Sequence, residues 1–112
     1  LKSRIEVADL CMVVFNSEFL RTLCEPVRIE LFRQLLLLGR SDVSTIADTM
    51  PQDRSVVTRH LQLMARVGLL RSDVEGRHVF YEIDGATILT KVDDISLLLK
   101  QLVPLCCDGT KT

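Results

Sequence analysis

The sequence has no tryptophan, one tyrosine and only four phenylalanines among its 112 residues. It also lacks an excess of charge of either sign, because 14 lysines and arginines face 15 aspartates and glutamates, for a net charge of −1. The overall charge therefore does not indicate nucleic-acid binding, and any such contact must come from local placement of charge. With 47% hydrophobic residues, the chain can form a core, and we expect one domain over residues 1–112.

Long apolar runs are also missing. No run approaches the roughly 18 residues that a membrane span needs, and the N-terminus lacks the pattern of a signal peptide. We therefore expect a cytoplasmic protein without a membrane partner. A Gly-rich phosphate loop, a Cys-x-x-Cys motif and a nucleophile with a nearby base are all absent from the sequence. These absences predict that the protein is not an enzyme and that it needs no cofactor for folding.

Helical patterns fill the N-terminal third. Apolar residues at helical spacing predict a first helix over about 4–20. A second helix should begin at Pro26, which suits the first helical position, and end before Gly39. Ser41 or Asp42 can cap a short third helix.

The stretch from 52 to 84 carries the main functional signal. Val57, Leu61 and Met64 recur at i, i+4 and i+7, which predicts a helix with one apolar face. From 54 to 71 there are four arginines and no carboxylate, so this stretch is locally cationic. The opposite face carries hydrogen-bond donors, namely Ser55, Thr58, Arg59, Gln62 and Arg66.

The elements around this helix predict its role. The short helix before it completes a helix-turn-helix over about 42–67. Two strand-like runs over about 69–83, with a turn at 75–76, form a hairpin of the kind called a wing. The predicted fold class is α+β, mainly α: a winged helix-turn-helix.

The first helix and a last helix over about 86–103 have apolar stripes wider than so small a domain can cover. Surplus apolar surface of this kind is best buried against a second copy with two-fold symmetry. We therefore predict a homodimer formed through these two helices.

A donor-rich helix followed by a basic wing tip is typical of binding to double-stranded DNA, in which Arg and Gln read base edges and hydroxyls reach phosphates. Winged helices also serve as protein-interaction modules, but such helices more often expose apolar anchors. The predicted DNA-binding residues are Gln52, Arg54, Ser55, Thr58, Arg59, His60, Gln62, Arg66, Arg77 and His78.

In order and spacing, four segments resemble the ArsR/SmtB family of bacterial winged-helix repressors: EPVR at 25–28, SVVTRHL at 55–61, GLL at 68–70 and EGRHVFY at 75–81. The resemblance covers about 19–83. It implies a homodimer that binds a pseudo-palindromic operator, represses transcription, and leaves DNA when an effector binds.

Several effector patterns of that family are missing. The third helix reads DVSTIAD at 42–48, without the Cys-x-Cys arrangement of arsenic and cadmium sensors. The last helix contains no histidine, so the Asp/His zinc site cannot be assembled. Persulfide-sensing members carry a cysteine within the second helix, where this chain has Phe32 and Arg33.

The cysteines are the remaining candidates for effector chemistry. A cytoplasmic location favours thiols over disulfides. Cys24 precedes a helix N-terminus, which favours a thiolate, and Cys106 and Cys107 lie together near the C-terminus. A site that combines this pair with Cys24, or less favourably with Cys11, suits As(III), Sb(III), Cd(II) or Hg(II) as inducer. The alternatives are a thiol redox or persulfide switch, or cysteines that simply fill space.

Overall fold

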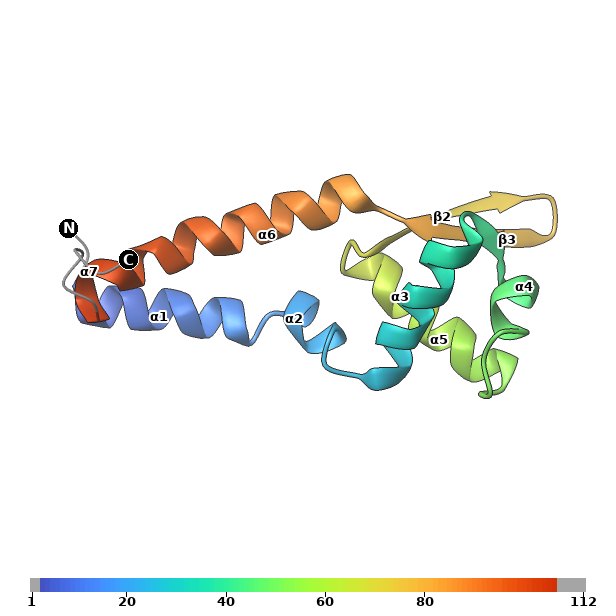
Figure 1. Cartoon of the computed structure of the whole chain (residues 1–112), viewed down its shortest axis with the longest axis horizontal. Helices are drawn as coiled ribbons and strands as arrows, with labels where there is room; N and C mark the ends of the chain where they lie inside the picture. Colours follow the sequence, from blue (N-terminus) through green and yellow to red (C-terminus); the bar gives the residue numbers. More distant parts are fainter. Residues whose placement is uncertain (1–2, 107–112) are drawn as a thin grey trace.

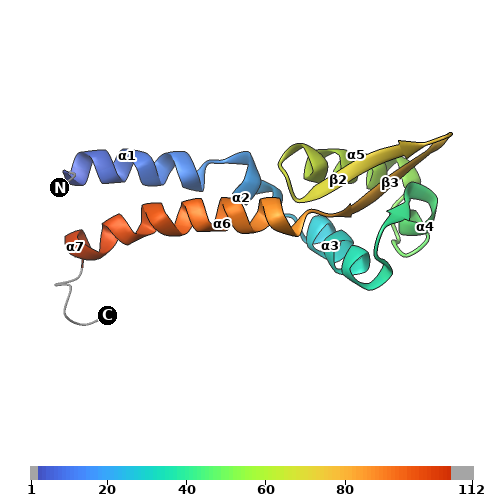
Figure 2. The ribbon, with the colours of Figure 1, turned by 90° about the horizontal axis from the view of Figure 1, so that it is seen from above.

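The computed structural model describes residues 3–106 as a winged helix-turn-helix body with a two-helix arm (Figure 1). The molecule is elongated, with extents of 55 × 23 × 23 Å. The body spans 18–83. The arm consists of the first helix and the helical C-terminal part, which lie side by side and antiparallel in both views (Figures 1 and 2).

The body contains four helices and a small sheet. The helices are α2 (Glu18–Thr22), α3 (Pro26–Leu38), α4 (Val43–Ala47) and α5 (Arg54–Arg66), and the strands are β1 (Ser41–Asp42), β2 (Leu70–Glu75) and β3 (His78–Ile83). Apolar side chains from every helix and from the wing meet in one core. Its fully buried members include Leu31 of α3, Ile46 of α4, and Val57, Leu61 and Met64 of α5.

The ends of α3 and α4 agree with the sequence prediction. Pro26 stands at the start of α3, and Gly39 ends it with φ 75°, a backbone conformation that glycine adopts without steric cost. Of the two predicted caps for the short helix, Asp42 is the one used, since its Oδ1 accepts a hydrogen bond from the backbone N–H of Thr45 at 3.0 Å. The short helix α4 and the helix α5 that follows it form the helix-turn-helix.

The sheet has three antiparallel strands in the order β1-β3-β2. The predicted hairpin is present, but its turn lies at 76–77 and not at 75–76, because β2 continues through Glu75. The strand β1 was not predicted. It pairs Ser41 with Tyr81 and Asp42 with Phe80, and a two-residue strand is too short to leave a period in the sequence. This pairing attaches the wing to the helix-turn-helix.

The arm differs from the prediction in two places. The helix expected over 4–20 is divided into α1 (Arg4–Phe15) and α2, because Ser17 caps α2 through the backbone N–H of Leu20. The helix expected over 86–103 is α6 (Gly85–Leu99), followed by one 3-10 turn over Lys100–Leu102 and the short α7 (Val103–Cys106). The chain therefore tightens just before Pro104 and then continues as a helix.

Gly68 lies where the arm meets the body. Its φ is 92°, and a Cβ at this position would lie 2.8 Å from Cγ2 of Thr87 and 2.9 Å from Cε of Lys91, both on α6. A side chain here would force Thr87 and Lys91 to shift, so glycine favours the close approach of α6 to the end of α5. No helix within residues 3–106 is long and apolar enough to cross a membrane.

Candidate nucleic-acid interface

The helix α5 presents one face to the core and the other to solvent. Val57, Leu61 and Met64 are fully buried, which fixes the helix about its own axis. The centre of the opposite face is exposed and consists of the donors Ser55, Arg59, Gln62 and Arg66. These four side chains make up the exposed stripe of α5. Thr58 lies at the edge of this stripe, where its hydroxyl donates to the carbonyl of Arg54 at 2.8 Å.

A groove separates α5 from the wing. Arg54 and Thr58 line it from α5, Arg77 and His78 line it from the wing, and Asp42 lies in it at the start of α4. The tertiary structure thus brings four of the predicted DNA-binding residues together from segments about twenty residues apart in the chain. Three of them supply cationic or protonatable groups, which suits contact with phosphate oxygens.

Asp42 is the one carboxylate among the described residues that line this groove. Hydrogen bonds from Thr45 lower the pKa of Asp42, and His78 and Arg54 lower it further. The Oδ2 atom of Asp42 lies 3.6 Å from Nδ1 of His78. The carboxylate therefore stays ionised, lies beside the wing histidine, and partly offsets the positive charge of the groove.

His60 lies beside the exposed stripe and is half-buried. Its Nδ1 accepts a hydrogen bond from Nε of Arg28 at 3.3 Å, while Nη1 of Arg28 donates to the carbonyl of Thr22 at 3.2 Å. Burial, Arg28 and Arg59 lower the pKa of His60, and Glu25 opposes them. An imidazole whose Nδ1 accepts a hydrogen bond carries its proton on Nε2. His60 can therefore reach a phosphate only as a neutral Nε2–H donor.

Two predicted DNA-binding residues, Arg66 and Gln52, do not line the groove. Arg66, in the last turn of α5, donates to Oε2 of Glu18 from Nη2 at 3.0 Å and from Nε at 3.2 Å. Gln52 is half-buried in the turn before α5, and its Oε1 is buried without a hydrogen-bond partner among residues 3–106. Helix-turn-helix proteins read bases with the N-terminal part of the recognition helix, which leaves Arg66 farthest from that end.

The predicted cysteine site is spread along the molecule. Cys11 is buried in the arm, whereas Cys24 and Cys106 are exposed. Cys24 lies between α2 and α3, and α7, which ends at Cys106, lies at the far end of the arm (Figures 1 and 2). One protomer therefore does not bring Cys24 and Cys106 together. Cys107 lies outside the described residues.

The surroundings of Cys24 also differ from the expectation. Its Sγ donates to the carbonyl of Leu20 at 3.4 Å, so the thiol faces the end of α2 and not the first amides of α3. Sγ of Cys106 donates to the carbonyl of Leu102 at 3.0 Å. Within residues 3–106, no three side chains of His, Cys, Asp or Glu are placed together to hold a metal ion.

Sequence reasoning did not assign Arg28, Asp42 or Glu18 to the interface, although each contacts a residue that it did assign. Arg28 and His60 are 32 positions apart, and Glu18 and Arg66 are 48 apart. Local patterns carry no signal for such pairs. Only the EPVR segment, which contains Arg28, indicated that this position differs from an ordinary surface arginine.

No protein-family model matches the sequence, and no curated protein matches it. Solved structures do match. A possible transcriptional regulator for arsenical resistance superposes with a TM-score of 0.63 and 24% identity, over 79% of this chain and 95% of that chain. An ArsR-like transcriptional regulator from Rhodococcus sp. RHA1 gives a TM-score of 0.64 and 20% identity, over 80% of this chain and 91% of that one.

A third match is a homodimeric winged helix-turn-helix DNA-binding domain from Mycobacterium bovis, described as a possible ArsR-family transcriptional regulator. Its TM-score is 0.61 at 20% identity, over 90% of each chain. At these identities the likeness shows the fold. The chain has the winged helix-turn-helix fold found in structures of ArsR-family transcriptional regulators, which confirms the predicted fold class.

Proposed function

We propose that this protein is a DNA-binding transcriptional repressor of the ArsR/SmtB type. The observation that carries the proposal is the groove in which Arg54 and Thr58 of the recognition helix lie beside Arg77 and His78 of the wing. A duplex against α5 would place base edges at the exposed stripe and a phosphate strand along this groove. The solved structures of similar fold, described as transcriptional regulators, support the same function.

Within the interface we assign the residues different roles. Ser55 and Arg59 lie in the N-terminal half of the exposed stripe, from which helix-turn-helix proteins contact base edges. Arginine pairs with guanine through two hydrogen bonds, so Arg59 is our main candidate for reading sequence. Arg54 and Arg77 contact phosphates and position the protein on the duplex.

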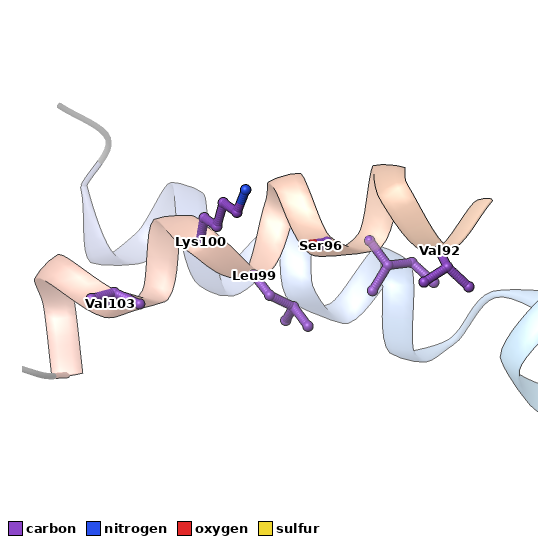
Figure 3. Close-up of a pocket in the computed structure, with 6 residues that line it drawn as sticks. Val92, Ser96, Leu99, Lys100 and Val103 are labelled. Carbon is purple, nitrogen blue, oxygen red and sulfur yellow. The ribbon is translucent and has the colours of Figure 1, made fainter. Parts of the chain in front are cut away.

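We propose further that the repressor is a homodimer joined through its arms. No residue of α6, which is described over its whole length, is buried, and Val7 and Cys11 are the only buried residues of α1. Figure 3 shows a shallow groove along α6 that Val92, Leu99 and Val103 help to line. Exposed apolar residues lie along both helices, namely Ile5, Met12, Val13, Phe15, Leu89, Val92 and Leu97. A second arm packed on this surface would complete a four-helix bundle and set the spacing of two recognition helices.

The DNA-binding proposal is tested by selection from a library of random duplexes with the purified protein, followed by sequencing of the retained DNA. We expect an inverted repeat whose half-sites lie about 10–11 base pairs apart, one helical turn, as a two-fold dimer requires. Arg59→Ala should lose the selected duplex, whereas Arg33→Ala, which removes an arginine on α3 paired with Glu30, should keep it. Failure of the wild-type protein to enrich any sequence would reject the proposal and favour an interaction module.

The dimer proposal is tested by sedimentation of Val92→Glu. A charge placed on the arm should produce a monomer at concentrations where the wild-type protein is a dimer. Leu37→Glu on α3 is a matched control, because Leu37 is an exposed apolar residue outside the arm. A monomeric Leu37→Glu variant beside a dimeric Val92→Glu variant would place the interface on α3 and contradict the proposal.

For the inducer, we propose a soft ion, As(III), Sb(III), Cd(II) or Hg(II), bound by cysteine thiolates. Cys106 is exposed at the end of the arm, and Cys107 follows it in the chain. Nη2 of Arg4 donates to the carbonyl of Leu105 at 2.7 Å, which ties this end of the chain to α1. Because Cys24 is far from Cys106 in one protomer, a third thiolate would come from a partner subunit. A ligand at the arm would change the dimer geometry and so lower operator affinity.

The inducer proposal is tested by titrating the protein–duplex complex with As(III), Sb(III), Cd(II), Hg(II), Zn(II), peroxide and persulfide in parallel. Release by the soft ions alone should disappear in the variant with both Cys106→Ser and Cys107→Ser. It should persist in Cys11→Ser, which changes a buried cysteine. Release by peroxide or persulfide alone would favour the redox alternative, and unchanged release from the double variant would exclude the terminal pair as the sensor.

A further inference from the structure

The wing carries more negative than positive charge. Residues 70–83 hold two arginines, Arg71 and Arg77, against three carboxylates, for a net charge of −1 with neutral histidine. Arg71 lies 3.2 Å from Glu82, at the end of the hairpin near the arm. The outer half of the wing therefore combines one arginine, Arg77, with the two carboxylates Asp73 and Glu75. This is an unfavourable composition for an element that approaches DNA phosphates.

Arg40, which lies outside the hairpin, balances this charge. Its Nη2 donates to Oε1 of Glu75 at 2.7 Å and to Oδ2 of Asp73 at 3.3 Å. Its Cζ also lies 4.2 Å from the centre of the Phe80 ring. In the register of the hairpin, Asp73 pairs with Phe80 and Glu75 with His78, so these four side chains lie on one face. Arg40 contacts three of the four.

Arg40 also has a fixed place relative to the helix-turn-helix. Arg40 directly precedes β1, which contains Asp42. As described above, Oδ2 of Asp42 lies 3.6 Å from Nδ1 of His78 in the wing. The wing therefore has contacts on either side of Ser41, through the ion pairs of Arg40 and through the approach of Asp42 to His78. Both contacts lie next to the turn that carries Arg77, since Glu75 and His78 flank this turn.

We propose that Arg40 is a positioning residue for DNA binding, which neutralises Asp73 and Glu75 and holds the wing so that Arg77 meets the phosphate backbone. The inference rests on the DNA-binding function proposed above. In this proposal Arg40 acts through the wing and not by a DNA contact of its own, because its Nη2 already donates to both carboxylates. Its ion pairs are largely exposed, with the carboxylate side chains 67% and 60% accessible, so they contribute little to folding. Loss of Arg40 should therefore appear in DNA affinity and not in stability.

The experiment measures the affinity of Arg40→Gln for the duplex selected by the wild-type protein, over a series of salt concentrations. We expect binding about five- to tenfold weaker at low salt, because two uncompensated carboxylates then face the phosphates. The difference should shrink as salt rises, and the melting temperature should stay close to that of the wild type. Arg33→Gln, which removes an exposed arginine on α3, is the control and should bind normally.

A rescue variant separates charge masking from direct contact. Arg40→Gln combined with Asp73→Asn and Glu75→Gln should recover most of the lost affinity, since there is no longer a charge to mask. If the triple variant stays as weak as Arg40→Gln, and the salt dependence falls by about one ion, Arg40 is a phosphate contact and the inference is wrong. Wild-type affinity in Arg40→Gln also overturns it. Absence of DNA binding by the wild-type protein would reject the proposed function, and this inference with it.

Discussion

The body and the arm of this protein both carry many apolar residues but bury them to very different degrees. In the body, α5 alone contributes three fully buried side chains, and they pack with residues from α3, α4 and the wing. In the arm, α6 contributes none over its fifteen described residues. The body thus buries the apolar face of its central helix within one chain, although Leu36 and Leu37 of α3 stay exposed, whereas no residue of α6 is buried.

Under the function proposed above, this difference separates two roles. A completed core holds α5 and the wing in a fixed relation, which a DNA-reading surface requires. The proposed dimer would pack on the exposed surface of the arm, so a ligand bound nearby would change the geometry of that packing. Substitutions in the core of the body should therefore lower folding stability more than substitutions on the exposed surface of the arm.

The largest effect should come from the core of the body. Leu61 is 0% exposed, so Leu61→Ala should lower the free energy of unfolding by about 2–5 kcal/mol, through lost burial and a cavity. Leu97 of the arm is 62% exposed, and Leu97→Ala should change the unfolding of a protomer little. Urea denaturation at several protein concentrations measures both variants. If both variants lost the same unfolding free energy at every protein concentration, the arm would bury its apolar side chains within one protomer as the body does, and the comparison would be wrong.

A smaller effect, confined to function, is expected at the exposed stripe. Arg59→Ala should weaken binding to the selected duplex by about 1–3 kcal/mol, because a base contact is lost while no core contact changes. Binding titrations check the affinity, and thermal denaturation checks that the fold is intact. The assignment of Arg59 to base reading fails if the variant loses affinity equally for all sequences, as expected for a phosphate contact.

The contact between the arm and the body can be tested at Gly68. Gly68→Ala should cost at least about 1–2 kcal/mol, because alanine is strained at φ 92° and its Cβ would meet Thr87 of α6. Gly76→Ala in the wing turn is a matched control, since Gly76 also has positive φ but no described atom lies within 4 Å of the place that the added methyl group would take. The additional loss of unfolding free energy in Gly68→Ala, relative to Gly76→Ala, measures the contact between the arm and the body. Equal losses would mean that α6 moves away freely.

The smallest effect should be a pH dependence that arises in the body. The pKa of His60 is lowered below its ordinary value of 6.5, chiefly by burial and by Arg28, so the folded protein binds the proton less readily than the unfolded chain. The stability that neutral His60 contributes is therefore present above about pH 6.5 and is lost as the pH falls through the lower, folded pKa.

Melting temperatures measured from about pH 8 to about pH 5 test this, because His60→Gln should remove part of the decline seen in the wild-type protein on acidification. The same variant distinguishes two modes of DNA contact. If protonated His60 bound a phosphate, affinity would rise on acidification in the wild type but not in His60→Gln. We expect no such rise, because Arg28 occupies Nδ1 of the imidazole.

Most of the fold could be predicted from local signals in the sequence. Pro26 and Gly39 mark the ends of α3, and the period of Val57, Leu61 and Met64 predicts α5 and its buried face. These signals work because helix ends and amphipathic faces depend on residues within a few positions of one another. The break between α1 and α2 was missed, because Ser17 caps a helix within a continuous apolar period.

The candidate interface was predicted residue by residue but not in its arrangement. The donor face of α5 follows from helical spacing, and Arg77 and His78 follow from the position of the wing turn. The hydrogen bonds and ion pairs around these residues join segments far apart in the chain, such as Arg40 with Glu75 and Arg28 with His60. No local pattern encodes such pairs, since their spacing depends on how the whole body packs.

The sequence by itself therefore determined most of the helices and the buried face of α5, and it supplied the candidate DNA-binding residues, because periodicity and end signals are local properties. Only the tertiary structure decided that Asp42 lies within the cationic groove, that Arg40 neutralises the wing, and that Cys24 and Cys106 lie apart. The physical reason is that electrostatic and thiolate chemistry acts over a few ångströms of space, and the fold sets those distances.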